Sequence, residues 1–469
     1  MAVLAASAVG CKFDTSALRD RDGAAVTDAS PRDARAEGGA VDGTLPPDGK
    51  LADGTLPTDA DSTCAAGERR CAGEDLQVCQ GQAWVTEITG CPLGCNASAS
   101  PPRCYAFTPH NVPAGSLTTG TYDWIVSANT TVDTDSGSGV PIEVGFATNP
   151  QTSAGEIAFF TVKSLRVEAG ATLRFAGSRV VAVVAADHVR IDGQIDASAS
   201  AGGAGPGGYA GGGPGADGQG PEPGTGAPHG ITAASYDDSG GSGGCHGTVG
   251  GHGGPGGIAA APGLCVSYGT TTCSPLVGGG GGGGGGDTSC GGRGGDGGGA
   301  VQLAAGRLIV VASTGAILAA GTGGAGGLLY TTCGDDSGSG GGGGAGGAIL
   351  LEAPDVQVAG TLAANGGGGG GGSDYYASAS GGNGQPGQAS RTQANGGAAG
   401  ATNSTASARG GDGGAAAGGP ADGSSASASY ANGGGGGGAV GRIAVFTRAG
   451  AAPGGTCSPD PVPQPIVPW

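Results

Sequence analysis

The stretch AILLEAPDVQVAGTLAANG, residues Ala348–Gly366, decides how the chain is expected to fold. Val356, Val358 and Leu362 are apolar, polar or small residues stand between them, and Gly360 lies at a bend. Period-two alternation interrupted by glycine is typical of short β-strands that bury one face. The outward positions between these apolar residues are Gln357, Ala359 and Thr361, and they carry no acid, base or nucleophile. The stretch therefore indicates a scaffold rather than a catalytic surface.

The same pattern occurs earlier as VVAADHVRIDGQIDAS, residues Val183–Ser198. There Val189, Ile191 and Ile195 take the apolar places and Gly193 takes the bend. Two segments that match position by position are expected to lie in register, one above the other. A single unit is too narrow to form a core, but stacked units bury a continuous column.

Five segments of this kind are spread along the chain. They cover residues 165–177, 183–198, 300–321 and 348–366, and in part 439–448. The sequence therefore predicts an all-β fold over residues 165–450, with a parallel β-helix or β-solenoid as the first choice. A flattened solenoid or irregular sandwich is the alternative.

The composition agrees with a thin, repetitive core. The 112 glycines and 28 prolines make up about 30% of 469 residues, a level typical of low-complexity or non-globular structure. Aromatic residues account for only 4% of the chain. The net charge of −18 argues against nucleic acid as a partner, because phosphate binding needs clustered lysine and arginine.

Three long glycine-rich insertions separate the repeats, at residues 199–299, 322–347 and 366–438. Each leaves just after a short strand and returns just before the next, so all three are expected to project from the same edge. Two interpretations remain open. The insertions are disordered, as glycine entropy favours, or they pack as extended helices of polyproline-II type, which need glycine wherever backbones approach closely.

The N-terminal region indicates export. Residues 1–11 are small and apolar and end in Cys11, a pattern expected of a lipoprotein signal whose cysteine is lipidated. The alternatives are a remnant of an ordinary secretory signal or a free thiol. Residues 12–63 read as an Asp-, Pro- and Gly-rich disordered linker. Membrane attachment is then expected through lipid only, with the protein on the outer membrane or cell surface, or secreted.

The cysteines predict disulfides in an oxidising compartment. Residues 64–104 form a small module, expected to be a hairpin with Leu76 and Trp84 at its core. Its six candidates are Cys64, Cys71, Cys79, Cys91, Cys95 and Cys104. A second set comprises Cys245, Cys265, Cys273, Cys290, Cys333 and Cys457, and three disulfides are expected in each set.

Residues 105–164 are expected to be a β-rich lead-in, with strands near residues 122–126 and 157–162. Between them, TVDTDSGSG at 131–139 reads as an Asp- and Ser-capped turn, with calcium binding as the alternative. Residues 451–469 are interpreted as a Pro-rich tail.

Metal-binding signals are weak. The motif GGxGxD ends at Asp217 and again at Asp296, as in calcium-binding nonapeptides. The apolar residue that should stand two positions after the Asp is absent in both places. Cys245 and His246, with His252 nearby, could bind zinc or copper, although a disulfide and solvated histidines explain them as well. No cofactor is therefore expected, with calcium kept as an alternative.

One charged row could carry chemistry on this fold. Arg190, Asp192 and Asp196 point outward from the repeat at 183–198, as the acids of polysaccharide-cleaving β-helices do. Alternating charge on a solvated strand face explains them equally well. No catalytic residue is assigned, and the chain is not expected to be an enzyme.

The order of parts resembles that of glycine-rich, Cys-rich surface lipoproteins of myxobacterial type. The shared motifs are the Cys-rich module, "LRVEAGATLR" and the "G-AILLEAP…V-G-L-ANGGGGGG" repeat. The resemblance implies an architecture and a surface location. We therefore expect a structural or adhesive surface protein, with an extracellular glycan or protein as its partner. A carbohydrate-binding or carbohydrate-cleaving β-helix and a calcium-dependent module are the alternatives.

Overall fold

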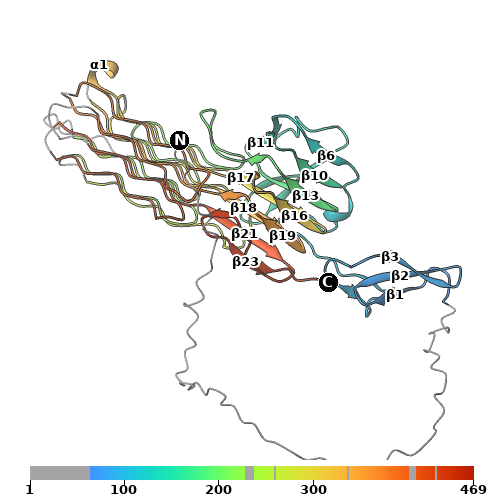
Figure 1. Ribbon diagram of the computed structural model, residues 1–469. Helices are drawn as coiled ribbons and strands as arrows, with labels where there is room; N and C mark the ends of the chain where they lie inside the picture. The colour runs from blue at the N-terminus through green and yellow to red at the C-terminus, as the bar shows by residue number, and fades with distance from the viewer. Residues whose placement is uncertain are drawn as a thin grey trace, which may run out of the picture. The chain divides into compact units, whose positions relative to one another are not determined.

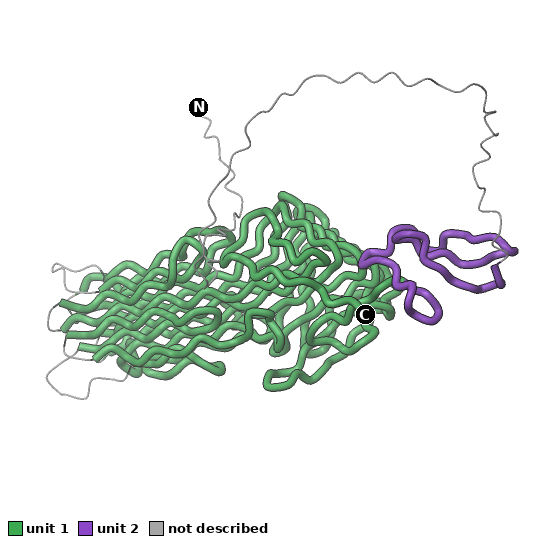
Figure 2. Tube along the Cα trace, turned by 90° about the horizontal axis from the view of Figure 1, so that it is seen from below, with its two compact units in different colours: residues 1–11, 104–469 green, residues 12–103 purple. Residues whose placement is uncertain are grey.

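The computed structural model is almost entirely β-sheet, and most of its strands are parallel (Figure 1). It describes residues 64–227, 237–257, 260–334, 337–375, 377–400, 408–427 and 430–469. The expectations for residues 1–63, including lipidation of Cys11, lie outside this range. The described residues form two compact units, 64–103 and 104–469 (Figure 2). Within the described ranges, none of the helices has the length and apolar character that a membrane crossing needs.

The smaller unit is a disulfide-bonded antiparallel sheet. Its strands are β1 (Arg69–Ala72), β2 (Asp75–Gln80) and β3 (Ala83–Ile88). Leu76 is buried as predicted, but Trp84 is only half-buried and lies under the Arg70 guanidinium, 4.4 Å from the ring centroid. The indole is therefore held by a cation–π contact as well as by burial.

All six cysteines of this region are disulfide-bonded. Cys64 pairs with Cys79 and Cys71 with Cys95, and Cys91 and Cys104 are bonded as well. A short pair of strands, β4 (Cys95–Asn96) and β5 (Arg103–Cys104), completes the region. So short a segment buries too little surface to fold unaided, and the cross-links supply the difference.

The larger unit contains three sheets. The first has five strands: β6 (Asp123–Val126), β10 (Ser164–Val167), β13 (His188–Ile191), β16 (Leu308–Val311) and β19 (Asp355–Val358). The second has six: β7 (Thr130–Asp133), β11 (Thr172–Ala176), β14 (Gln194–Asp196), β17 (Ala316–Leu318), β20 (Thr361–Ala363) and β22 (Thr456–Ser458). The third has seven: β8 (Gly145–Gln151), β9 (Ala154–Val162), β12 (Val180–Ala185), β15 (Ala300–Ala305), β18 (Ala348–Glu352), β21 (Arg442–Thr447) and β23 (Val462–Pro465). Only β8 and β9 pair antiparallel in these three sheets.

The strand register matches the predicted alignment of the repeats. Val189 lies beside Ile309, which lies beside Val356 in the first sheet. In the second sheet Ile195 and Leu362 flank Ile317 in the same way. All of these side chains except Val356 belong to one buried apolar cluster enclosed by the three sheets, and the partly buried Val356 packs against it. Successive repeats therefore extend one column, because each adds a residue of the same kind at the same place.

The sheets extend beyond the predicted limits at both ends. β6, β7 and β9 pair parallel with β10, β11 and β12, so the column starts at Asp123 and not at residue 165. At the other end β22 and β23 pair with β20 and β21, so residues 451–469 are not merely a tail. β23 contains two prolines, which a strand at the edge of a sheet tolerates because one side needs no donors.

The glycine-rich insertions leave and return at the same edge, as predicted. They depart after β14, β17 and β20 of the second sheet and return at β15, β18 and β21 of the third. Together their described residues form the body that we call the glycine bundle, drawn as layers of near-parallel traces beside the sheets (Figure 1). Its one named element is the short helix α1 (Tyr330–Cys333); a 3₁₀ turn, η2 (Ser116–Thr118), lies outside it.

Backbone hydrogen bonds hold the bundle together. Successive N–H groups of Gly279–Gly286 donate in turn to three segments, and the carbonyls of 279–285 accept in turn from three others, with N···O distances of 2.7–3.1 Å. The acceptors lie at 292–298, 239–245 and 216–219, and the donors at 209–215, 342–345 and 224–227. A three-residue repeat without internal hydrogen bonds is that of a polyproline-II helix. The run therefore has six neighbours, in agreement with the packed-helix interpretation.

Glycine is required in this run because neighbouring backbones approach too closely for a Cβ atom, and not because the backbone adopts a left-handed conformation. No residue of 278–286 has a positive φ. A Cβ on Gly282 would overlap the carbonyl of Gly342, and one on Gly283 would overlap that of Thr225. Three other runs, 338–347, 366–373 and 432–440, have six neighbours in the same pattern. The uninterrupted glycine runs thus form the interior of the bundle.

At the edge of the bundle every third residue carries a side chain. In GGRGGDGG, residues 291–298, Arg293 and Asp296 are three apart and pair at 2.8 Å. Asp296 Oδ1 also accepts from the Gly211 N–H at 2.8 Å, supplying the acceptor that a further helix would otherwise provide. Asp412 does the same for the Gly396 N–H in the similar segment 408–414.

The second cysteine set forms two disulfides instead of the three predicted. Cys245 pairs with Cys265, and Cys290 pairs with Cys333. Cys273 and Cys457 are buried and form no disulfide. Cys457 lies on β22 inside the apolar column, where a thiol packs as a small hydrophobic side chain. The prediction of a third disulfide, made from the even number of cysteines in this set, was therefore wrong.

Candidate binding tip of the glycine bundle

The bundle ends, away from the three sheets, in a set of turns that we call the tip. Its described residues are 237–239, 287–290, 328–334, 337–339, 373–375, 377–380 and 430–432. α1 marks this end in Figure 1. Contacts join these distant parts of the chain, because Asn432 donates to Ser337 and the Leu329 N–H donates to the Ser380 hydroxyl.

Three tyrosines from three different turns lie in a row at the tip. The rings of Tyr330 and Tyr375 stack with centroids 4.6 Å apart and planes 19° apart. Tyr430 follows, 6.4 Å from the Tyr375 ring. Tyr330 and Tyr430 are each 36% exposed. We call this row the tyrosine ladder; it presents aromatic surface to solvent at the end of a hydrogen-bonded body.

Tyr430 adopts a conformation that is unusual for its residue type. Its φ is +68°, in the left-handed region that disfavours a bulky side chain by roughly 1–2 kcal/mol. Its N–H donates to Asp237, and its carbonyl accepts from the Tyr375 N–H at 3.1 Å. Residues held in such conformations by their surroundings cluster at ligand-binding sites. The strain therefore supports a binding role for this end.

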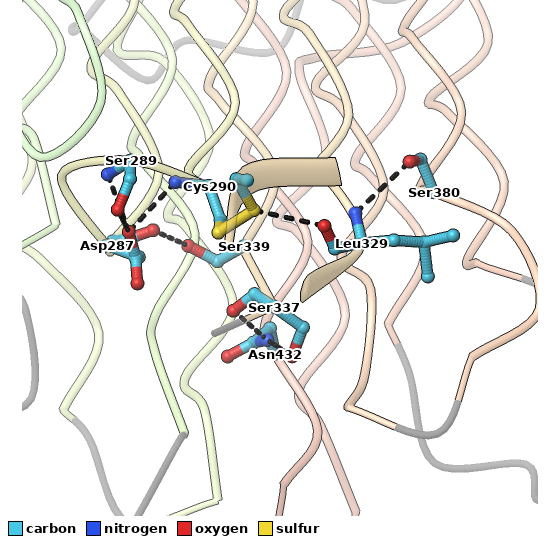
Figure 3. Close-up of a disulfide and its surroundings, with 10 residues drawn as sticks. Asp287, Ser289, Cys290, Leu329, Ser337, Ser339, Ser380 and Asn432 are labelled. Carbon is cyan, nitrogen blue, oxygen red and sulfur yellow. Dashed lines mark hydrogen bonds between the residues drawn. A yellow bond between two sulfur atoms is a disulfide. The ribbon is translucent and has the colours of Figure 1, made fainter. Parts of the chain in front are cut away.

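A disulfide and a polar network link the turns of the tip (Figure 3). Cys290–Cys333 joins the turn at 287–290 to α1. Asp287 accepts from the N–H groups of Ser289 and Cys290 at 2.6 and 2.8 Å, which closes that turn. Ser339 donates to the Ser239 carbonyl at 2.6 Å. The turns are thus fixed to one another rather than only to the bundle.

The solvent-facing chemistry of the tip is hydroxyl-rich and lacks basic groups. Its described residues include no lysine or arginine. Asp237, Asp238, Asp287 and Asp374 are at most 4% exposed, so their carboxylates face the protein. The exposed hydroxyl residues are Thr288, Ser289, Thr331, Thr332 and Ser378. Exposed tyrosine and serine on a rigid scaffold are typical of binding loops.

The charged row predicted from sequence lies elsewhere, on the outer faces of the first and second sheets. Arg190 binds Asp192 in a bidentate pair at 2.7 and 2.9 Å, and Arg174 pairs with Asp196. Each carboxylate thus faces an arginine rather than another carboxylate. Such pairs of opposite charge are expected on a solvent-exposed strand face.

The weak metal candidates are placed apart from one another. Asp217 accepts from the Gly226 N–H at 2.7 Å, and Asp296 caps the bundle edge as described above. His252 lies near the Pro262 carbonyl at 3.4 Å, and Cys245 is in a disulfide. Over the part of the chain that the structure describes, no three His, Cys, Asp or Glu side chains are grouped to hold a metal ion.

His246 is enclosed in the bundle. Its Nδ1 lies 2.8 Å from the Gly346 carbonyl and its ring lies 5.0 Å from that of Tyr268, while Nε2 has no partner. Because the ring is fully buried, its pKa falls to about 4. The residue is therefore neutral at pH 7 and donates from Nδ1.

Sequence reasoning missed a polar cluster on the outer face of the third sheet. His110 Nδ1 contacts Glu352 at 2.6 Å, and Gln302 donates to the same carboxylate at 2.6 Å. The hydrogen bond to Glu352 raises the pKa of His110. The available signal was a polar residue in each of two apolar strands, Gln302 in the interior of AVQLAA and Glu352 at the end of AILLE.

Two hollows flank this cluster. One of about 180 Å³ lies over His110 and Phe446. The other, a cleft of about 550 Å³, is lined by Asn111, Asn149 and Gln151 among others. Their amides are already engaged, since Gln151 bonds both the N–H and the carbonyl of Leu276. The cleft therefore offers a ligand fewer unsatisfied groups than its polar lining suggests.

No family model, curated protein or solved structure matches the chain.

Proposed function

We propose that the protein is a non-catalytic adhesive or structural protein of the cell surface, with the tip as its contact point. In this proposal the sheets form a parallel β-helix. The strand order supports it, because each pass of the chain adds one strand to each of three sheets. The glycine bundle is then a rigid side body that carries the tip outward from the column.

The observation that carries the proposal is the tip itself. Three separate turns bring Tyr330, Tyr375 and Tyr430 into one row, on a body whose backbone is hydrogen-bonded throughout its interior. A rigid scaffold that presents aromatic and hydroxyl groups at one end loses little entropy on binding. The charged row of the sheets is paired internally, Arg174 with Asp196 and Arg190 with Asp192, so it offers no comparable site.

The proposed location follows from the N-terminal sequence. Cys11 would carry lipid and residues 12–63 would act as a tether between the membrane and the folded units. Disulfides in both units support an oxidising compartment. Replacing Cys11→Ser should move the protein from the membrane fraction to the medium; retention of the variant in the membrane would contradict lipid anchoring.

Display of the full chain on a Gram-negative host cell tests the adhesive function. We expect displaying cells to be retained on agar, glass or neighbouring cells above the background of cells without the protein. The double variant Tyr330→Ser and Tyr430→Ser should lose this gain, whereas Ile142→Ser, which alters an apolar residue 96% exposed outside the tip, should keep it. No gain in retention for the unaltered chain would contradict the proposal.

A further inference from the structure

The tyrosine ladder offers a small aromatic surface rather than a broad apolar one. A tyrosine has roughly 150–250 Å² of surface to bury, so 36% exposure leaves about 50–90 Å² on each of Tyr330 and Tyr430. A stable protein interface buries about 800 Å² on each partner. The exposed rings of the described tip thus fit a ligand of one or two small rings better than a protein surface.

The groups around the ladder select the chemical class of that ligand. Aromatic faces carry negative charge density and attract the weakly positive C–H groups of a saturated ring. The exposed hydroxyls of Thr288, Ser289, Thr331 and Thr332 can exchange hydrogen bonds with a polar ring edge. A ligand with apolar faces and hydroxyl edges satisfies both kinds of group.

Charge excludes the anionic members of this class. The described tip has no lysine or arginine, and the chain as a whole carries a net charge of −18. A sulfated, phosphorylated or uronic acid ligand would find no cation there and would be repelled at long range. The tip therefore favours an uncharged ligand.

We infer that the tyrosine ladder binds a neutral carbohydrate, with sugar rings stacked against Tyr330 and Tyr430. The inference rests on the proposed adhesive function and names the ligand class of that same tip. Tyr375 lies between the two exposed rings and fixes their spacing through its stack with Tyr330.

The test uses the purified full chain and defined polysaccharides. Dextran, galactomannan and agarose are the neutral probes, and alginate and dextran sulfate are the anionic ones. We expect retention on at least one neutral probe and on neither anionic probe. Tyr330→Ala or Tyr430→Ala should weaken binding about 3- to 10-fold, the scale of one aromatic contact.

Matched variants separate binding from folding. Tyr330→Phe keeps the ring and should retain most of the affinity, and Ile142→Ser should change nothing. Unaltered melting temperatures would show that the alanine variants still fold. Equal affinity of folded Tyr330→Ala, Tyr430→Ala and unaltered protein would overturn the assignment of the ladder.

Treatment of the target surface separates this inference from the proposed function. Periodate opens sugar rings that carry adjacent hydroxyls, as those of dextran and galactomannan do. It should therefore abolish retention of the displaying cells on a dextran or galactomannan surface, while protease should not. If protease abolishes retention and no neutral polysaccharide competes, the ligand is a protein and the inference fails, although the adhesive function stands. If displaying cells show no retention on any surface, both fail.

Discussion

The sheet column and the glycine bundle are built from the same chain but are held together in opposite ways. In the column, side chains such as Phe160, Leu303 and Ile317 fill the space between three sheets. In the bundle, the interior has almost no side chains, and each interior helix is bonded through its backbone to six neighbours. The column is stabilised by apolar burial, whereas the bundle is stabilised by hydrogen bonds between the N–H and carbonyl groups of neighbouring helices.

The difference explains the unusual composition. A column of short strands needs few large residues, because each repeat adds only a few to a shared core. The bundle needs none in its interior and excludes them where the backbones approach. Its side chains are confined to the edges and the tip, where Asp296 and Asp412 replace missing backbone acceptors. Low aromatic content is thus compatible with an ordered protein.

Removing a side chain should destabilise the column most. Leu303 lies on β15, is fully buried and belongs to the apolar cluster. Leu303→Ala should lower the free energy of unfolding by about 2–5 kcal/mol, because it leaves a cavity. Leu264→Ala, at a site 40% exposed, should stay within about 0.5 kcal/mol. Equal effects of the two variants in chemical denaturation would contradict a side-chain-packed column.

Adding a single methyl group to an interior glycine should destabilise the bundle. Gly283→Ala would place a Cβ against the Thr225 carbonyl, so a neighbouring backbone must shift. We expect a loss of about 1–3 kcal/mol, the usual range for overpacking. Thermal and chemical denaturation measure it.

Gly213→Ala is the matched control, because Gly213 is exposed and its Cβ would meet nothing within 4 Å. This substitution should be neutral or slightly stabilising, since alanine restricts the unfolded chain. If Gly283→Ala behaves like Gly213→Ala, the interior of the bundle is not closely packed.

The two regions should respond oppositely to acid. The pKa of His246 falls to about 4 through burial in the bundle, so only the unfolded state binds its proton between about pH 6.5 and 4. This histidine should lower stability by about 1.4 kcal/mol for each pH unit across that window as pH falls. In denaturation measured against pH, His246→Gln should flatten that slope, and an unchanged slope would contradict the buried neutral ring.

His110, beside the third sheet, should change the stability of the protein with pH in the opposite direction. Its pKa is raised by the hydrogen bond to Glu352, so its contribution is complete below the unfolded value of about 6.5 and is lost as pH rises through the folded pKa. His110→Gln should therefore remove stability at pH 5 more than at pH 8. A larger loss at pH 8 would contradict the ion pair.

The smallest effect is expected at the edge of the bundle. Asp296→Ala removes the acceptor of the Gly211 N–H and the partner of Arg293, and should lower stability by about 0.5–1.5 kcal/mol. Asp296→Asn keeps an acceptor oxygen and should recover most of the loss. If Asp296→Asn is as destabilising as Asp296→Ala, the ion pair rather than the backbone cap supplies the stability.

Much of the column could be predicted from sequence because its signal is local and repeated. The alignment of Val189 with Val356 follows from the shared pattern, and the glycine bends mark where each strand ends. A strand near 122–126 was predicted, but neither it nor the strand at 130–133 was assigned to the column, because their pattern lacks the glycine bend of the later repeats. The strands at 456–465 were missed because prolines hide an edge strand.

The tip and the polar cluster could not be predicted in the same way. Tyr330, Tyr375 and Tyr430 come together only because the glycine segments between them pack in a fixed order, and no local pattern encodes that order. The His110–Glu352 pair joins residues 242 apart in the chain. The glycine period did contain one usable signal, since interior runs are uninterrupted and edge segments carry a side chain every third residue.

Amide hydrogen exchange across residues 278–299 tests the central claim most directly, because that claim is a rigid body held by backbone hydrogen bonds. The N–H groups of Gly279–Gly286 all donate to neighbouring segments, so the peptide should exchange as slowly as the buried strand β15. Exchange at the rate of an unfolded glycine peptide would show that the insertions are not packed and that the tip has no rigid support.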